Sequence, residues 1–386
     1  MPAMLTLPPL SLYIHIPWCV QKCPYCDFNS HGLKNKGTQS IPESAYIQHV
    51  LDDLKQDLKY VQNRKLYSIF IGGGTPSLLS QAAMKTLLDG VQALIPFESD
   101  IEITMEANPG TLETEKFQGF QQAGITRMSL GVQSFQEQKL SALGRIHDKQ
   151  QAIDAAKWVN QIGLNSFNLD LMHGLPNQSI DDALSDLQHA IDLAPPHLSW
   201  YQLTLEPNTL FYSQPPVLPK DDTLWDIQER GHALLLANGY EQYEVSAYSK
   251  PDYQCKHNLN YWQFGDYLGI GCGAHGKITL PQQNKIIRTS KVKHPKGYMD
   301  LTKPYLYEQQ EIAESDRPFE FFLNRFRLFS PCDLNQFEQY TGLPSSHVSS
   351  ILEQAQTKQL ITVNNNIVTL TQQGRWHLNT LLALFM

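Results

Sequence analysis

Three cysteines, Cys19, Cys23 and Cys26, lie within eight residues in the segment HIPWCVQKCPYCDFNS, residues 15–30. Thiolates are soft ligands that suit zinc ions and iron–sulfur clusters. A structural zinc site takes a fourth cysteine or histidine, and the next candidate along the chain is His31. Three thiolates can instead hold three irons of a [4Fe–4S] cluster and leave the fourth iron open to a small molecule. The spacing favours such an open cluster.

The elements that position these cysteines can be inferred from six short apolar runs, each followed by turn residues. The runs are LYIHIP (12–17), SIFIGGG (68–74), IEITMEANP (101–109), RMSLGVQSF (127–135), SFNLDLMHG (166–174) and LSWYQLTLEP (198–207). Amphipathic stretches separate them, a pattern that predicts βα units and a parallel sheet. Six units in 207 residues indicate a full or partial barrel. Chemically interesting residues follow the strands, at the face where barrels build their sites.

The remainder of the chain has a different pattern. We expect a barrel core over residues 1–207, a bridging region over 208–310 that completes the site, and a C-terminal domain over 311–386. Within the bridging region, the segments YEQYEVSAYS and YLGIGCGAHGKITL predict strands. Helical stretches followed by a hairpin around residues 364–366 predict a mainly helical, winged-helix-like C-terminal domain. Residues 331–386 hold two basic residues against three acidic ones, which argues against nucleic acid as a partner.

Composition limits the class of protein further. The chain of 386 residues has 41% hydrophobic residues, and 30 basic against 38 acidic residues give a net charge of −8. No apolar run approaches the roughly 18 residues of a transmembrane helix. The start, MPAMLTLPPLSLYIHIP, carries prolines and lacks the basic residues of a signal peptide. We therefore expect a soluble cytoplasmic protein without a transmembrane anchor. In that reducing compartment clustered cysteines more often bind metal than form disulfides.

The motif Cys19-x3-Cys23-x2-Cys26 resembles that of radical S-adenosylmethionine (SAM) proteins. In that family SAM chelates the open iron, and an electron from the cluster cleaves SAM to a 5′-deoxyadenosyl radical. Further segments occur in the order found in the branch that contains oxygen-independent coproporphyrinogen III oxidase: YIHIPWCVQKCPYC, GGGTPSLL, EANPGT, GVQSF, LGRIH and NLDLMHGLPNQ. Within that branch the chain is most similar to the heme chaperones. The resemblance implies an α/β fold with a partial (β/α)6 radical SAM barrel, a [4Fe–4S] cluster and SAM.

The same resemblance implies roles in SAM binding. Gly74 and Thr75 belong to the turn GGGTP, whose glycines let the backbone approach a ligand, and Glu106 matches a carboxylate that contacts SAM. Other positions match residues that bind one or another SAM in the oxidase: Tyr13, Tyr25, Gln133, Arg145 and Asp170. A plain βα connection remains the alternative for the turn, and polar packing at the barrel mouth for Gln133 and Asp170.

GCGAHGKI, residues 271–278, satisfies G-x-G-x-x-G and nearly satisfies a phosphate-loop pattern. Ile278 stands where a hydroxyl must hold Mg²⁺. The residues that follow predict a strand and a turn, whereas a phosphate site needs a helix. We therefore reject a nucleotide-binding loop. The family resemblance implies instead that this segment closes over the adenosine of SAM.

A histidine-containing element, CKHNLNYW (255–262), matches the H-N-x-x-Y-W element of the heme chaperones. His257 supplies an imidazole that can ligate heme iron, and Tyr261 and Trp262 offer aromatic surfaces for a flat macrocycle. With Asn258, these residues are the expected heme-binding set. A packed, hydrogen-bonded histidine is the alternative. Cys255 is either a second ligand or a buried thiol, and we assign Cys272 and Cys332 to packing.

Two functions from different classes fit these motifs. One is the radical decarboxylation of coproporphyrinogen, and the other is the binding of heme and its delivery to recipient hemoproteins without enzymatic turnover. The oxidases carry a further cysteine where this chain has Phe28, and they have a longer segment before the motif than the 18 residues that precede Cys19 here. Together with H-N-x-x-Y-W, these features favour the chaperone. Recipients in respiratory chains would bring transient contact with membrane complexes.

Overall fold

Six parallel strands form the centre of the protein. The computed structural model describes residues 4–33, 41–111, 114–300 and 302–386. The strands are β1 (Leu10–Ile16), β4 (Leu66–Gly73), β5 (Phe97–Ala107), β6 (Arg127–Gln133), β7 (Ser166–His173) and β8 (His197–Gln202). They lie side by side in chain order within one sheet, and each coincides with one of the six apolar runs. The predicted βα architecture is confirmed.

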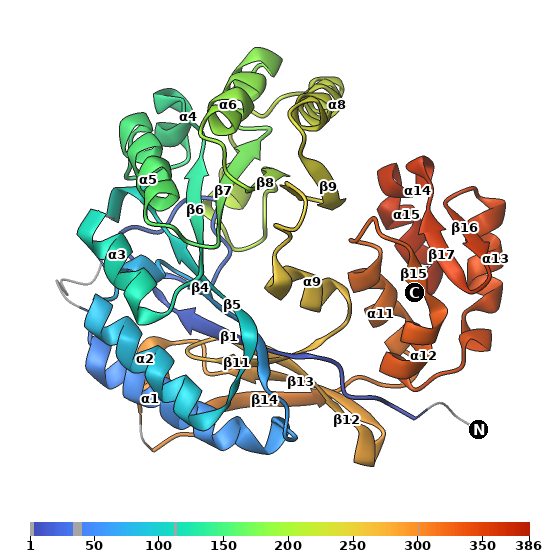
Figure 1. Ribbon diagram of the computed structural model, residues 1–386. Coiled ribbons are helices and arrows are strands. Elements are labelled where there is room, and N and C mark those ends of the chain that lie inside the picture. Colours follow the sequence, from blue (N-terminus) through green and yellow to red (C-terminus); the bar gives the residue numbers. More distant parts are fainter. Residues whose placement is uncertain (1–3, 34–40, 112–113, 301) are drawn as a thin grey trace.

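Helices cover the outer face of this sheet (Figure 1). They are α1 (Glu43–Asp57), α2 (Gln81–Leu94), α3 (Thr114–Ala123), α4 (Glu137–Ala142), α5 (Lys149–Gln161), α6 (Ile180–Asp192) and α8 (Asp221–Ala237). Asp148 and Ser179 begin α5 and α6 with capping boxes, in which each side chain accepts a hydrogen bond from the backbone of the third helical residue. Consecutive strand residues such as Ser68 and Ile69 are both 0% exposed. Both faces of the sheet are therefore covered, as in other parallel sheets.

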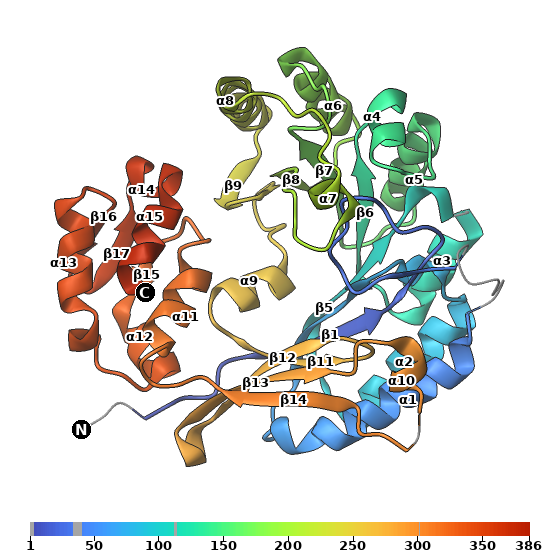
Figure 2. The ribbon, with the colours of Figure 1, turned by 180° about the vertical axis from the view of Figure 1, so that it is seen from behind.

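The sheet continues past both ends of the parallel set. Strand β11 (Asp266–Ile270) adds parallel to β1, and the antiparallel strands beyond it are β12 (His275–Leu280), β13 (Lys285–Lys291) and β14 (Leu306–Glu311). At the other end, β10 (Ala247–Ser249) and β9 (Glu241–Glu244) follow β8. Strands β9 and β14 are the edges, so the sheet curves without closing (Figure 2). The expected partial barrel is confirmed.

Short elements complete the barrel and its opening. They are β2 (Trp18–Cys19), β3 (His31–Gly32), α7 (Leu210–Ser213), α9 (Lys256–Trp262) and α10 (Pro295–Tyr298). Helix α9 lies between the two ends of the sheet, near the C-terminal domain (Figure 1). The expected strands of the bridging region are present as β9 to β12, whereas strand β13 and helices α8 and α9 were not predicted.

The C-terminal domain has a separate aromatic core. Its elements are α11 (Arg317–Arg325), β15 (Cys332–Asp333), α12 (Leu334–Thr341), α13 (Ser349–Thr357), β16 (Ile361–Asn364), β17 (Ile367–Leu370), α14 (Gln372–Trp376) and α15 (Leu378–Leu382). Phe321, Phe322 and Phe337 pack together in its centre. Phe264, which precedes β11, lies with its ring centroid 5.6 Å from that of Phe321. The domain is thus attached to the barrel through a shared apolar core.

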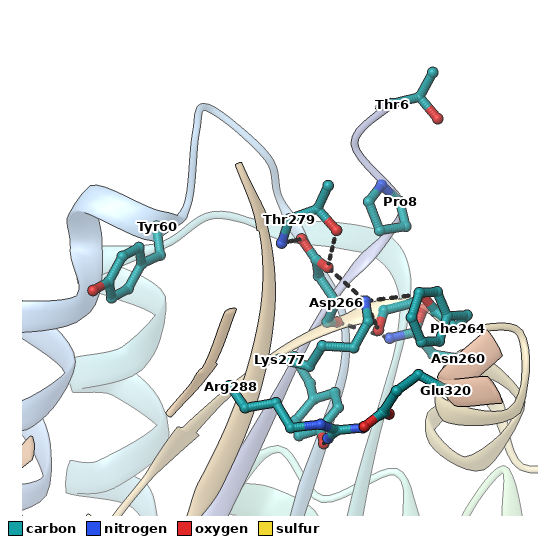
Figure 3. A network of polar contacts seen from close by, with 12 residues as sticks. Thr6, Pro8, Tyr60, Asn260, Phe264, Asp266, Lys277, Thr279, Arg288 and Glu320 are labelled. Carbon is teal, nitrogen blue, oxygen red and sulfur yellow. Dashed lines mark hydrogen bonds and ion pairs between the residues drawn. The ribbon is translucent and has the colours of Figure 1, made fainter. Parts of the chain in front are cut away.

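A buried polar network fixes the turn between α9 and β11 (Figure 3). The Asp266 carboxylate accepts hydrogen bonds from Lys277 Nζ at 3.1 Å and from Thr279 Oγ1 at 2.8 Å. Lys277 also donates to the carbonyl of Phe264 at 3.0 Å, and Asn260 on α9 donates to the Asp266 carbonyl at 2.9 Å. The Lys277 and Asp266 side chains are 3% and 0% exposed. This network therefore sets the position of α9 from inside the protein.

A tryptophan pair joins the barrel to the C-terminal domain at the surface. Trp225 on α8 and Trp376 on α14 meet edge to face, with ring centroids 5.4 Å apart. The two residues are 45% and 52% exposed. They bring the outer helix α8 and the C-terminal domain into contact across the open side of the barrel.

Candidate functional site

A cavity of about 590 Å³ lies at the carboxyl ends of the parallel strands. Its size is within the usual range of small-molecule sites. The sequence-predicted residues that line it are Cys19, Cys23, Tyr25, Cys26, Gly74, Thr75, Glu106, Gln133, Arg145, Asp170, Asn258 and Trp262. The structure thus brings twelve of the fifteen predicted site residues to one cavity; Tyr13, His257 and Tyr261 lie outside its lining.

The three thiols of the cysteine loop lie on one wall of this cavity. Cys23 and Cys26 are joined by a turn, in which the Cys26 N–H donates to the Cys23 carbonyl at 3.2 Å. All three are half-buried, free thiols. In the part of the chain that the structure describes, no three His, Cys, Asp or Glu side chains converge on a point that could hold one metal ion. A single zinc ion needs such convergence, because its ligands lie about 2.0–2.3 Å from the metal. A four-iron cluster takes one thiolate at each of three corners, and the three cysteines that line this cavity offer three such thiolates.

The surroundings of the thiols are polar. Arg145 Nη1 donates to Cys23 Sγ at 3.7 Å, and Cys26 Sγ lies 3.6 Å from the Ser30 hydroxyl. Burial raises the pKa of the Cys19 and Cys26 thiols. A bound metal would displace those protons, because thiolates are the ligating form. Hydrogen-bond donors beside sulfur also stabilise the negative charge of a thiolate cluster.

The glycine turn brings backbone to the cavity edge beside the thiols. Gly73 has a φ of 104°, in the region that favours glycine. A Cβ atom at this position would lie 2.2 Å from Cε1 of His15. Gly74 and Thr75 are held against the β2 segment, since their N–H groups donate to the carbonyls of Ile16 and Trp18 at 2.7 and 2.8 Å. The turn therefore brings the main chain of Gly73 and Gly74, together with the Thr75 side chain that hydrogen-bonds to Cys19, next to the cysteine loop.

Two carboxylates face the cavity without a cationic partner. Glu106 Oε2 accepts a hydrogen bond from the Gly73 N–H at 3.1 Å. Asp170 accepts from the Ser129 hydroxyl and from the Asn168 amide, each at 2.8 Å. Within the described chain neither forms an ion pair. Burial, and secondarily the charge of Asp170, raises the pKa of Glu106 to about 7. Arg127 acts on Asp170 only through its charge, without a direct ion pair. Buried carboxylates beside a glycine edge suit a cationic ligand such as the amino and sulfonium groups of SAM.

Gln133 occupies the strained end of strand β6. Its φ is 68°, which is uncommon for a residue with a side chain. The pairing of β6 with β7 shifts its register between Gly131 and Gln133. The Gln133 amide oxygen accepts a hydrogen bond from the Tyr201 hydroxyl at 2.9 Å. Arg145 donates to the Gly131 carbonyl at 2.6 Å, and its Nε is buried without a partner in the described structure. Strain and an unpaired donor at one point are typical of a binding site.

Helix α9 divides the H-N-x-x-Y-W element between two faces. Asn258 and Trp262, four residues apart, lie on the face that lines the cavity. His257 and Tyr261 lie on another face, with ring centroids 4.6 Å apart. His257 is 1% exposed, and its Nδ1 lies 3.0 Å from the Ser68 hydroxyl. The cavity therefore does not reach His257 in this conformation.

The chemistry of the His257 ring nevertheless suits a metal ligand. Burial lowers the pKa of His257 to about 3, so the imidazole is neutral. Its Nε2 has no hydrogen-bond partner among the described residues. A neutral imidazole with one nitrogen hydrogen-bonded and the other free is the form that binds metals.

A second cavity, of about 610 Å³, is lined by two of the three remaining predicted residues, Tyr13 and Tyr261. The Tyr13 hydroxyl lies 2.9 Å from His15 Nδ1, and His15 Nε2 lies 2.9 Å from the carbonyl of Asn29. Because Asp27, Phe28 and Ser30 line both cavities, the two spaces adjoin at the cysteine loop.

The three remaining cysteines and the glycine-rich segment that begins at residue 271 are also placed by the structure. Cys255, Cys272 and Cys332 are all buried. Cys255 donates to Glu102 Oε1 at 3.4 Å at the start of α9, outside the cavity lining. Residues 271–274 form a turn that leads into strand β12, as expected for a segment that is not a phosphate loop.

The cavity-wall residues that sequence reasoning did not single out include Tyr201, Glu244 and Arg327. Arg327 follows α11 in the C-terminal domain, and its Nη2 donates to Glu244 Oε2 at 3.2 Å. These two residues are 83 positions apart in the chain. No local pattern in the sequence places them together.

The fold and the cysteine loop define a radical SAM protein with an attached C-terminal domain. Residues 13–190 match the radical SAM superfamily, and residues 312–377 match the HemN C-terminal domain. This class implies a [4Fe–4S] cluster and SAM. The solved structure of coproporphyrinogen III oxidase (HemN) from Escherichia coli superposes with a TM-score of 0.82 at 22% identity, covering 98% of this chain and 90% of that one. The overall fold is thus shared with that enzyme.

Comparison with related proteins shows to which family of radical SAM proteins this chain belongs. Heme chaperone HemW of Escherichia coli (strain K12) is 59% identical over 383 residues, which cover 99% of this chain and 100% of that one. Heme chaperone HemW of Haemophilus influenzae is 57% identical over 98% of both chains, and that of Bacillus subtilis is 32% identical over 97% and 99%. This chain belongs to the HemW heme chaperone family.

Proposed function

We propose that this protein is a heme chaperone that binds a [4Fe–4S] cluster and SAM, takes up heme and passes it to recipient hemoproteins. The observation that carries the proposal is the 59% identity, over 99% of this chain, to a protein named heme chaperone HemW. Cys19, Cys23 and Cys26 would hold the cluster, whose open iron would take SAM and supply one-electron chemistry.

The cavity residues have complementary tasks in this proposal. Gly74, Thr75 and Glu106 would bind SAM beside the cluster, as would Tyr13 from the second cavity. The other residues expected to bind SAM line the same cavity, namely Tyr25, Gln133, Arg145 and Asp170. They would contact parts of the bound SAM that extend away from the glycine turn. Two observations support a shared site: the Glu106 and Asp170 carboxylates line the cavity without an ion-pair partner among the described residues, and Arg145 supplies a positive charge beside Cys23.

Heme binding is assigned to His257, Asn258, Tyr261 and Trp262. Support comes from the neutral imidazole of His257 with its free Nε2, and from the position of Trp262 on the cavity wall. Ligation of iron by His257 requires either that α9 move or that the cavity extend past this helix, because His257 is 1% exposed.

The cellular setting of the proposal is the cytoplasm, with recipients that include hemoproteins of respiratory chains. No helix among the described residues is long and apolar enough to cross a membrane. Contact with a membrane-bound recipient would therefore be transient and made through the recipient.

An anaerobic heme titration of the reconstituted protein tests the proposal. The protein is titrated with hemin with and without SAM, and is then mixed with an apo-hemoprotein whose spectrum reports heme uptake. We expect saturable binding and recovery of heme on the acceptor. A parallel incubation with coproporphyrinogen, SAM and a reductant should form no protoporphyrinogen. Failure to bind heme would overturn the proposal. Formation of protoporphyrinogen would overturn it in favour of a coproporphyrinogen oxidase.

A further inference from the structure

The cavity contains very little positive charge. Two cationic side chains, Arg145 and Arg327, are found among the described residues that line it, against five acidic ones. Arg145 lies at the cysteine loop, within hydrogen-bonding distance of Cys23. Arg327 comes from the C-terminal domain and lines the same cavity as α9. Among the described residues that line the cavity, Arg327 is therefore the cationic side chain available to an anionic group that binds away from the cysteine loop.

The position of Arg327 is fixed by its backbone. The Arg327 carbonyl accepts from the Val245 N–H at 3.2 Å, and the Phe329 N–H donates to the Tyr243 carbonyl at 3.1 Å. These bonds attach the segment after α11 to strand β9, with a bridge between Glu244 and Leu328. The backbone of Arg327 is therefore held against the barrel, although the residue belongs to the C-terminal domain.

The side chain of Arg327 lies over an aromatic ring and keeps donors unused. Its guanidinium carbon lies 4.3 Å from the centre of the Trp262 ring. In the described structure Nη2 of its side chain donates a hydrogen bond to Glu244, and its Nε is buried without an acceptor. The indole Nε1 of Trp262 is also buried without an acceptor. Unpaired buried donors are costly, which makes them indicators of a missing acceptor.

We infer that Arg327 and Trp262 form a carboxylate-binding subsite at the end of the cavity that the C-terminal domain closes. This inference rests on the proposed function and specifies its ligand: the subsite would take a propionate carboxylate of the porphyrin. A carboxylate accepts from several donors at once and pairs well with a guanidinium edge. Glu244 holds the guanidinium by Nη2 and leaves Nε available. The flat indole beside the subsite would lie next to the macrocycle.

Iron-free porphyrins separate this subsite from iron ligation. Protoporphyrin IX, with two free propionates, and its dimethyl ester, with none, are titrated into the full-length protein under the same detergent conditions and followed by porphyrin fluorescence. We expect the wild type to prefer the diacid. Arg327→Gln should lower affinity for the diacid about tenfold or more and leave affinity for the ester unchanged. Trp262→Phe, which keeps an aromatic ring and removes the N–H, should show a smaller loss of the same kind.

Glu244→Gln distinguishes a ligand site from an interdomain strut. The variant retains an acceptor for Arg327 and removes a negative charge that opposes an incoming carboxylate. We expect it to bind the diacid at least as tightly as the wild type, whereas a strut weakened by the loss of its ion pair would bind both porphyrins less well. Equal affinity of the wild type for diacid and ester, or an equal loss for both in Arg327→Gln, would overturn the subsite. Absence of any binding of hemin by the wild type would instead overturn the proposed function.

Discussion

The Nδ1 atom of His257 lies 3.0 Å from the hydroxyl oxygen of Ser68, which connects helix α9 to the first half of strand β4. Ser68 is in turn 2.7 Å from the hydroxyl of Ser11 on β1. The histidine of the H-N-x-x-Y-W element is thus part of a buried polar chain that crosses the base of the barrel. It has a structural position as well as the chemistry of a metal ligand.

Replacement of His257 by alanine separates these two roles. We expect His257→Ala to lose affinity for hemin, keep its affinity for iron-free protoporphyrin, and retain the cluster spectrum. The free energy of unfolding should also fall by about 1–3 kcal/mol, because the buried Ser68 loses a partner. Ser68→Ala is the control, since it alters the same hydrogen bond without removing the imidazole. Unchanged hemin affinity in His257→Ala would remove this residue from the heme site.

The cysteine loop makes a prediction about iron content. Cys23→Ser should leave the reconstituted protein with a much lower iron and sulfide content, because one corner of the cluster loses its thiolate. Cys255→Ser should retain both, since Cys255 is buried at the start of α9 and donates to Glu102. Chemical analysis and the visible spectrum after anaerobic reconstitution give the answer. A cluster that survives in Cys23→Ser would contradict the assignment of the loop.

Glu106 should make stability depend on pH. Burial raises its pKa from 4.5 to about 7 in the folded protein. Between these values the unfolded chain binds fewer protons than the folded one, so the free energy of unfolding falls as pH rises. We expect Glu106→Gln to be more stable than the wild type at pH 8 by roughly 1–3 kcal/mol, a difference that disappears near pH 4.5.

Urea unfolding of the cluster-free protein across this pH range measures the effect of Glu106. Glu98, whose side chain is 45% exposed and lies 3.9 Å from Lys65, provides the control variant Glu98→Gln, which removes a carboxylate at the surface. A stability difference between Glu106→Gln and the wild type that stays constant with pH would show that the carboxylate is not the titrating group.

The Asp266–Lys277 pair should dominate the stability of the α9–β11 turn. Asp266→Ala leaves a buried ammonium group with a lost partner, and such changes cost about 3–5 kcal/mol. The exposed pair of Lys285 and Glu311, 2.7 Å apart, is a matched comparison. Glu311→Ala should cost less than about 1 kcal/mol. Denaturant unfolding tests both, and similar losses in the two variants would show that burial of the Asp266 pair is unimportant.

Much of the barrel is evident from the sequence because its signals are local. Each of the six parallel strands follows from an apolar run with turn residues after it, and the Cys19–Cys26 spacing is a property of one loop. The same holds for the C-terminal helices and for the hairpin at residues 361–370. Local periodicity determines which segments are strands, and strand ends determine where loops gather.

The parts that sequence patterns did not predict depend on contacts between distant segments. Strand β11 was expected as a strand, but nothing local indicates that it adds in parallel to β1. The sequence predicts that residues of the α9 segment bind heme. It does not show that His257 and Trp262 face different environments, because the helix itself was not predicted. Arg327 belongs to an aromatic stretch of the sequence and follows helix α11. Its position on the cavity wall arises only when the C-terminal domain pairs with β9.

The edge-to-face contact between Trp225 and Trp376 has a practical consequence. One indole belongs to the barrel and the other to the C-terminal domain, and both are partly open to solvent. Any parting of the two halves would change the environment of both rings and therefore their emission. Tryptophan fluorescence should therefore report a separation of the barrel and the C-terminal domain without an attached dye.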